Sequence, residues 1–185
     1  MGGLTDPHAW QSLVAAQRYV ENIRAALVAA RPAQAAAIDA RAKAYTAQLA
    51  ALDAHVRARL AAIAPAQRRI VTSHDAFGYL ADAWGLEMRA ALGWTSAGEA
   101  SAADVARLIR QLKAQQARAL FVENISDPRL VERIAREAGA SVGGTLYSDA
   151  LSPPGTRADS YLKLMTHNAE TLLAALAPSP SNHRR

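Results

Sequence analysis

The chain has 185 residues, no cysteine and a formal net charge of +5 at pH 7. It is long enough for one domain and part of another. Without cysteine, neither disulfides nor thiolate metal sites can form. No apolar run reaches the length of a transmembrane helix, and the first five residues lack the basic region and apolar core of a signal peptide. The arginines are spread along several predicted helices without a recognised nucleic-acid motif, so we expect no nucleic-acid partner.

Two long helices are predicted in the first third of the chain. The first covers about residues 11–30, and the second covers about residues 33–63, with Pro32 between them. The apolar stripe of the first helix consists of Leu13, Val20, Ile23 and Leu27. In the second helix, Asp39 and Lys43 lie one turn apart and are expected to pair. A helix of this length spans about 45 Å, which suits a strut between two lobes.

Short apolar strands alternate with helices in the rest of the chain. The predicted strands are residues 69–73, 86–92, 119–122 and 141–146. The predicted helices are residues 75–84, 101–116, 128–139 and 159–177. This alternation favours the α/β class, with a parallel sheet that is flanked by helices and connected by right-handed crossovers.

Three candidate metal ligands lie in short blocks where a loop or strand gives way to a helix. His8 stands in Asp-Pro-His-Ala-Trp, His74 follows the first predicted strand, and Asp149 follows the last. Ligand sites of parallel sheets lie beyond the carboxyl ends of the strands, so we expect His74 and Asp149 at one edge. Two histidines and an aspartate suit zinc, with manganese possible. Glu123, after the third strand, is interpreted as an acceptor that fixes the tautomer of a ligand histidine.

Each candidate also has a purely structural interpretation. His8 could stack on the indole of Trp10, His74 could cap the following helix, and Asp149 could be a turn residue. A metallohydrolase could use the same histidines and aspartate, with Glu123 as general base. No HExxH helix, nucleophile elbow or paired-carboxylate dyad supports that alternative. A further alternative is a metal-independent interaction module that pairs through its helical segment.

The chain resembles the metal-binding solute receptors of ATP-driven zinc and manganese importers, the cluster A-I family. The stretches that carry the resemblance are Asp6–Trp10, Thr72–Tyr79, Phe121–Asn124 and Gly144–Leu151. The resemblance implies two α/β lobes joined by a long rigid helix, with His8, His74 and Asp149 among the metal ligands. It also implies a binding protein without catalysis, periplasmic or otherwise extracytoplasmic, that delivers its ion to the membrane permease of an ABC importer.

The resemblance implies a division of the chain as well. We expect residues 1–32 to be a remnant of an N-terminal lobe, 33–64 the linker helix, 65–178 the C-terminal metal-binding lobe and 179–185 a disordered tail. The family's first ligand, a histidine of the N-terminal lobe, has no counterpart here, so the chain is expected to be a C-terminal portion. Three ligands on elements not fixed to one another should bind zinc weakly. The uncovered stripe of the first helix predicts a homodimer.

Overall fold

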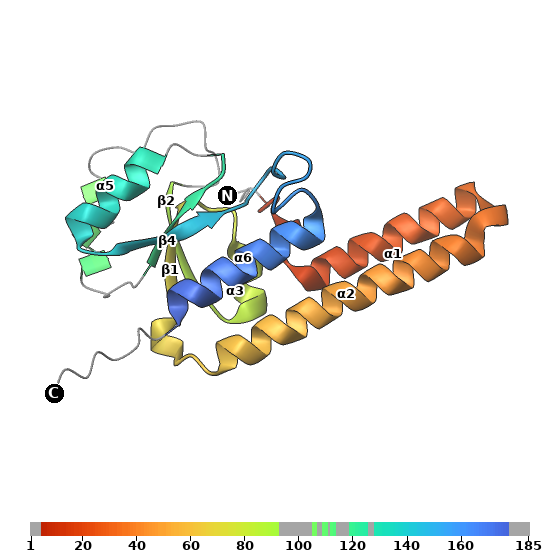
Figure 1. Ribbon diagram of the computed structural model, residues 1–185, viewed down its shortest axis with the longest axis horizontal. Coiled ribbons are helices and arrows are strands. Elements are labelled where there is room, and N and C mark those ends of the chain that lie inside the picture. The colour runs from red at the N-terminus through yellow and green to blue at the C-terminus, as the bar shows by residue number, and fades with distance from the viewer. Residues whose placement is uncertain are drawn as a thin grey trace.

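The computed structural model describes residues 5–92, 105–106, 109–110, 112–113, 119–125 and 128–177, and at positions 73, 74, 91 and 92 it describes the backbone alone. An α/β lobe and a long helical hairpin that projects from it make up this part of the chain (Figure 1). The predicted helix over 101–116 lies partly outside the described residues, and the predicted tail 179–185 lies wholly outside them. No described helix is long and apolar enough to cross a membrane.

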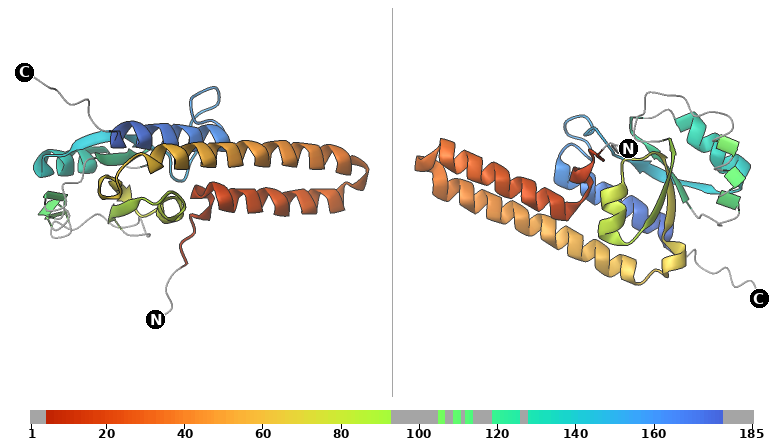
Figure 2. Two further views of the ribbon diagram at one scale, coloured as in Figure 1. Left: turned by 90° about the horizontal axis from the view of Figure 1, so that it is seen from below. Right: turned by 180° about the vertical axis from the view of Figure 1, so that it is seen from behind.

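The hairpin consists of helices α1 (Leu13–Ala30) and α2 (Ala35–Ala61), which lie side by side and run in opposite directions (Figures 1 and 2). Ser12 is the N-cap of α1, and its hydroxyl accepts a hydrogen bond from the backbone N–H of Ala15. A 3-10 turn, Pro32–Gln34, makes the reversal, with proline in the first helical position where its missing N–H costs nothing. Both predicted helices are confirmed.

Burial differs sharply along α1, whereas on α2 Ile38 near the tip is only 8% exposed. Near the lobe, apolar residues of both helices are at most 5% exposed, namely Leu13, Ala16, Leu49, Val56 and Leu60. Toward the tip, α1 carries large apolar side chains that are 42–58% exposed, namely Tyr19, Ile23 and Leu27. There the Arg24 side chain of α1 forms an ion pair with Asp39 of α2 at 2.8 Å. The prediction that Asp39 pairs with Lys43 is therefore wrong.

The lobe is built on a four-stranded sheet in the order β2-β1-β3-β4. The strands are β1 (Arg69–His74), β2 (Glu87–Leu92), β3 (Ala119–Glu123) and β4 (Ser141–Leu146). Each neighbouring pair is parallel, so all four strands end at the same edge of the sheet. The predicted α/β class with a parallel sheet is confirmed.

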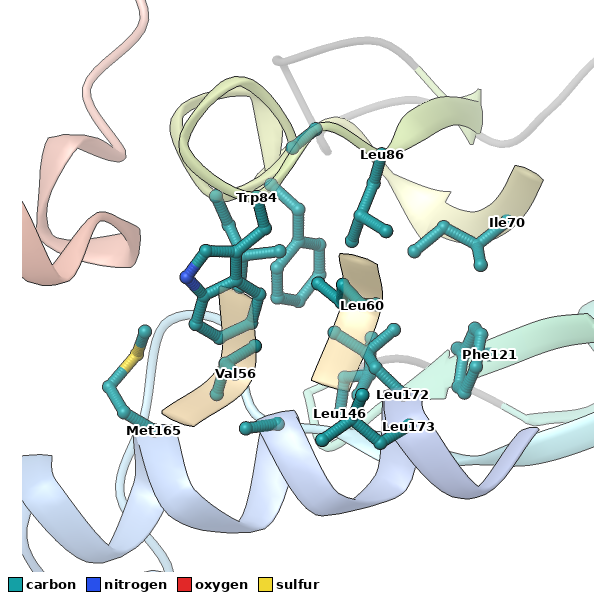
Figure 3. Close-up of a cluster of buried hydrophobic side chains, with 14 of the residues drawn as sticks. Val56, Leu60, Ile70, Trp84, Leu86, Phe121, Leu146, Met165, Leu172 and Leu173 are labelled. Carbon is teal, nitrogen blue, oxygen red and sulfur yellow. The ribbon is translucent and has the colours of Figure 1, made fainter. Parts of the chain in front are cut away.

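Helices cover both faces of the sheet. They are α3 (Gly78–Trp84), α5 (Pro128–Ala138) and α6 (Tyr161–Leu176). Successive strand residues point to opposite faces, so in β3 Phe121 joins one apolar cluster and Leu120 joins the other. The larger cluster gathers side chains from α2, α3, α6 and the sheet (Figure 3). The smaller cluster lies under α5 and the described positions between 105 and 112.

Two contacts fix the helices around the larger cluster. The Asp53 carboxylate of α2 accepts hydrogen bonds from the Trp84 indole at 2.9 Å and from the Arg57 side chain at 2.7 Å, which ties α2 to α3. On the other side, α6 can approach β4 closely because Gly143 has no side chain: a Cβ atom there would lie 2.9 Å from the Cβ atom of Ala175 in α6. The predicted division at residues 32, 64 and 178 stays a prediction.

Candidate metal centre

The candidate residues of the lobe lie at the carboxyl edge of the sheet. His74 is the last residue of β1, Glu123 is the last residue of β3, and Asp149 stands in the loop that follows β4. The prediction that His74 and Asp149 share one edge is therefore confirmed for their backbone positions. The side chain of His74 lies outside the described part of the structure.

The N-terminal segment brings His8 to the same place. His8 precedes a short 3-10 helix, Ala9–Gln11, and is only 4% exposed. Its Nε2 atom lies 3.6 Å from Oδ1 of Asp149, whose side chain is 32% exposed. Two donor atoms that each bind one tetrahedral zinc at about 2.0–2.1 Å lie about 3.4 Å apart. The observed separation is thus close to that of two ligands of one ion.

Asp6 sets the orientation of the His8 ring. Its Oδ1 atom accepts a hydrogen bond from the backbone N–H of His8 at 2.9 Å and lies 2.7 Å from Nδ1 of the ring. An ionised carboxylate can only accept hydrogen bonds, so Nδ1 carries a proton, and Nε2, on the side of Asp149, is the nitrogen that a neutral ring offers to a metal ion. This pairing of carboxylate and histidine is typical of metal-binding histidines.

Asp6 also ties this segment to the connection between β1 and α3. Its Oδ2 atom lies close to Gly78: a Cβ atom on that glycine would be only 3.1 Å from it. Because Gly78 is the first residue of α3, the carboxylate lies against the segment that follows His74. Residues 75–77 are not helical, so α3 begins three residues later than predicted.

The loop that carries Asp149 is held by Asn124. The side-chain oxygen of Asn124 accepts a hydrogen bond from the backbone N–H of Ser148 at 3.1 Å, and its nitrogen donates to the carbonyl of Ala150 at 3.1 Å. One side-chain amide thus hydrogen-bonds the backbone on both sides of Asp149. Sequence reasoning gave this residue no role, although its position directly after the β3 strand could have drawn attention to it.

The expectation that the ligand elements are not fixed to one another is wrong for His8 and Asp149. The Trp10 indole N–H donates to the carbonyl of Ser148 at 3.2 Å, so the two segments are bonded directly. The Trp10 ring also packs edge-on against the ring of His8, with centroids 5.4 Å apart. The structural interpretation of His8 predicted that it stacks on Trp10; the two rings are in contact, but edge to face at 70°, and this contact is compatible with a ligand role.

The remaining titratable candidates take different positions. Glu123 is 1% exposed at the end of β3, and its role beside a ligand histidine stays a prediction. His55 is exposed on α2, and His167 lies on α6 with Nε2 2.9 Å from the carbonyl oxygen of Thr145. Among the side chains that the structure describes, no three His, Asp or Glu residues form a metal-binding group.

Residues 2–175 of the chain match the sequence model of the family described as "Zinc-uptake complex component A periplasmic". The chain belongs to this family. A similar relative is "Zinc-binding protein TroA" of Treponema pallidum, 37% identical in an alignment that covers 93% of this chain and 58% of the relative. "Manganese-binding lipoprotein MntA" of Bacillus subtilis is 33% identical over 95% of this chain and 59% of its own length. The chain therefore spans somewhat more than half the length of these zinc-uptake-family relatives.

Solved structures of the family agree with the fold. The periplasmic zinc-binding protein TroA of Treponema pallidum superposes with a TM-score of 0.88 and 33% identity, over 94% of this chain and 64% of that protein. The Mn-bound periplasmic metal-binding protein of Candidatus Liberibacter asiaticus gives a TM-score of 0.85 and 30% identity, over 95% of this chain and 65% of that one. These relatives are named as binding proteins, and some are named as lipoproteins or as periplasmic.

Proposed function

We propose that this chain binds a divalent transition-metal ion through His8, His74 and Asp149, as part of a receptor that delivers the ion to the membrane permease of an ABC importer. The observation that carries the proposal is the 3.6 Å separation of His8 Nε2 and Asp149 Oδ1. The family membership supports the transport role and a place outside the cytoplasm. The receptor acts by binding and release, without catalysis.

Zinc is the ion that the donor set favours. Two imidazole nitrogens and one carboxylate suit zinc, and the short distance between His8 and Asp149 fits tetrahedral coordination. Manganese, which prefers more oxygen donors, is the alternative that the names of several relatives support. In this proposal Glu123, buried at the end of β3, accepts a hydrogen bond from the ligand histidine His74 and fixes its tautomer.

Zinc titration by calorimetry tests the proposed site. We expect His8→Ala, His74→Ala and Asp149→Ala each to weaken zinc binding by about 100-fold, because each removes a bond to the metal. Binding should also weaken below about pH 6, as protons compete for the two imidazoles.

The control variants are His55→Ala and His167→Ala, which remove histidines outside the proposed ligand set. Both should bind zinc as the wild type does. Loss of binding in a control, together with unchanged binding in His74→Ala, would show that the site is elsewhere. Hydrolysis of ester or peptide substrates by the zinc-loaded protein would favour the metallohydrolase instead.

We also propose that the chain self-associates through α1. The predicted uncovered stripe is wrong for Leu13, which is buried, and for Val20, which is partly buried. The exposed apolar side chains of α1 are Val14, Tyr19, Ile23 and Leu27, at 42–58%. Light scattering over a range of concentrations should show a metal-independent dimer that Ile23→Glu disrupts. A monomer at every concentration would exclude this proposal without affecting the metal site.

A further inference from the structure

The segments that carry His8 and Asp149 share one set of hydrogen bonds just behind the two ligands. The side-chain nitrogen of Gln11 donates to the carbonyl of Ser148 at 2.8 Å and lies 3.3 Å from the carbonyl oxygen of Tyr147. These carbonyls belong to the two residues directly before Asp149. Gln11 itself follows His8 by three positions, so one side chain joins the backbones of both ligand segments.

Gln11 is a buried polar residue whose orientation is determined by these contacts. It is 0% exposed, and both carbonyls can only accept hydrogen bonds, so its NH2 group must face them. The Trp10 indole donates to the same Ser148 carbonyl. A buried N–H donor is costly unless it is hydrogen-bonded, and both donors meet this need at the one Ser148 carbonyl, whereas Oε1 of Gln11 is buried without a hydrogen bond among the described residues.

Both sides of this junction are anchored to α6. The Tyr161 hydroxyl donates to the carbonyl of Trp10 at 2.6 Å, which holds the His8 segment. The Asn168 side chain accepts from the backbone N–H of Tyr147 at 2.8 Å and donates to the carbonyl of the same residue at 2.8 Å, which holds the Asp149 loop. Asn168 is 0% exposed. The same helix, α6, therefore holds both ligand segments in place by hydrogen bonds.

We propose that Gln11 is a positioning residue that brings His8 and Asp149 to their mutual distance before the metal ion arrives. The ordering of the two segments then costs free energy during folding and not during metal binding, which raises the affinity. This inference rests on the proposed metal-binding function. Unlike the proposed function, the inference also predicts that the two ligand segments are already joined in the metal-free protein.

The first test measures solvent exchange of the Trp10 indole N–H by NMR, with the signal assigned by its loss in Trp10→Phe. In the metal-free wild type we expect this proton to exchange far more slowly than an exposed indole, because its bond to Ser148 is already formed. In metal-free Gln11→Leu, which keeps the buried volume and removes the amide, exchange should accelerate. Rapid exchange in the metal-free wild type would overturn the inference, whether or not the protein binds zinc.

The second test measures zinc affinity in Gln11→Leu at a temperature well below its melting transition. We expect a loss of about tenfold, as for other residues that orient metal ligands. Added zinc should restore slow exchange of the Trp10 indole in this variant. Backbone amides of α5 should exchange as in the wild type throughout, which a global destabilisation would not leave unchanged. The matched control is Gln48→Leu, an exposed glutamine on α2 whose side chain bonds the carbonyl of Ala44. Wild-type affinity in Gln11→Leu would overturn the inference. Absence of zinc binding in the wild type would overturn the proposed function, and with it the role of Gln11 in metal binding.

Discussion

The two ends of the helical hairpin have similar amino-acid types but very different surroundings. At the lobe end, Leu13 is fully buried in the large cluster, whereas Leu27, on the same helix near the tip, is 47% exposed. Polar contacts differ in the same way, since Asp53 is buried between α2 and α3 and Asp39 lies in the open. An apolar stripe in the sequence thus predicts which side of a helix faces its neighbours. How much each apolar side chain stabilises the fold depends on whether other elements pack against it.

The largest effect should come from a matched pair of leucine truncations on α1. Leu13→Ala should lower the free energy of unfolding by about 3 kcal/mol, because it leaves a cavity in the cluster beside the lobe. In the monomer, Leu27→Ala should change it by less than about 0.5 kcal/mol, because its side chain faces solvent there. Urea unfolding followed by circular dichroism, at protein concentrations below the range of the proposed dimer, measures both. Equal losses at these concentrations would contradict the comparison, whereas a loss in Leu27→Ala that appears only at higher concentration would come from the proposed α1 dimer.

The sequence predicted the elements of the fold because helices and strands have different apolar periods. It could not predict the partner of Asp39, because Arg24 approaches it only once the two helices are antiparallel. It found His8 and Asp149 from their residue types and their positions beside turns and strand ends. It missed Gln11 and Asn168, because a buried amide has no sequence signature until the carbonyls that it binds are known.

The next effect compares the two aspartates of α2. Asp53→Ala should lower the free energy of unfolding by about 2 kcal/mol, since it leaves the buried Trp84 indole N–H without its acceptor. Asp39→Ala removes only an ion pair with Arg24 near the tip and should produce no measurable change. Near-UV circular dichroism should report the altered Trp84 environment in the first variant alone. A loss in Asp39→Ala as large as that in Asp53→Ala would contradict the comparison.

The smallest effect concerns pH at the lobe end. Burial raises the pKa of the Tyr161 phenol above its usual range, and nearby Tyr45 and Tyr19 add to the shift. The folded state therefore favours the neutral phenol, so this contribution to stability is complete below about pH 10, the usual tyrosine value, and is lost as the pH rises further.

Tyr161→Phe provides the test of this pH dependence. At pH 8 it should cost about 1 kcal/mol, because the hydrogen bond to the Trp10 carbonyl is lost. Between pH 9 and about 11 its stability should fall less steeply than that of the wild type. Urea midpoints across this range measure the difference, and parallel curves would show that the Tyr161 phenol is not the group responsible.

The bond between Gln11 and Ser148 joins residues 137 positions apart, and this separation has a kinetic consequence. The hairpin closes through neighbouring segments and can form early, whereas contacts between distant segments must first overcome the entropy of closing a long loop. The N-terminal segment can meet the loop after β4 only after residue 149 has left the ribosome. Until then a growing chain cannot present His8 and Asp149 together, so the proposed ion site forms late in folding.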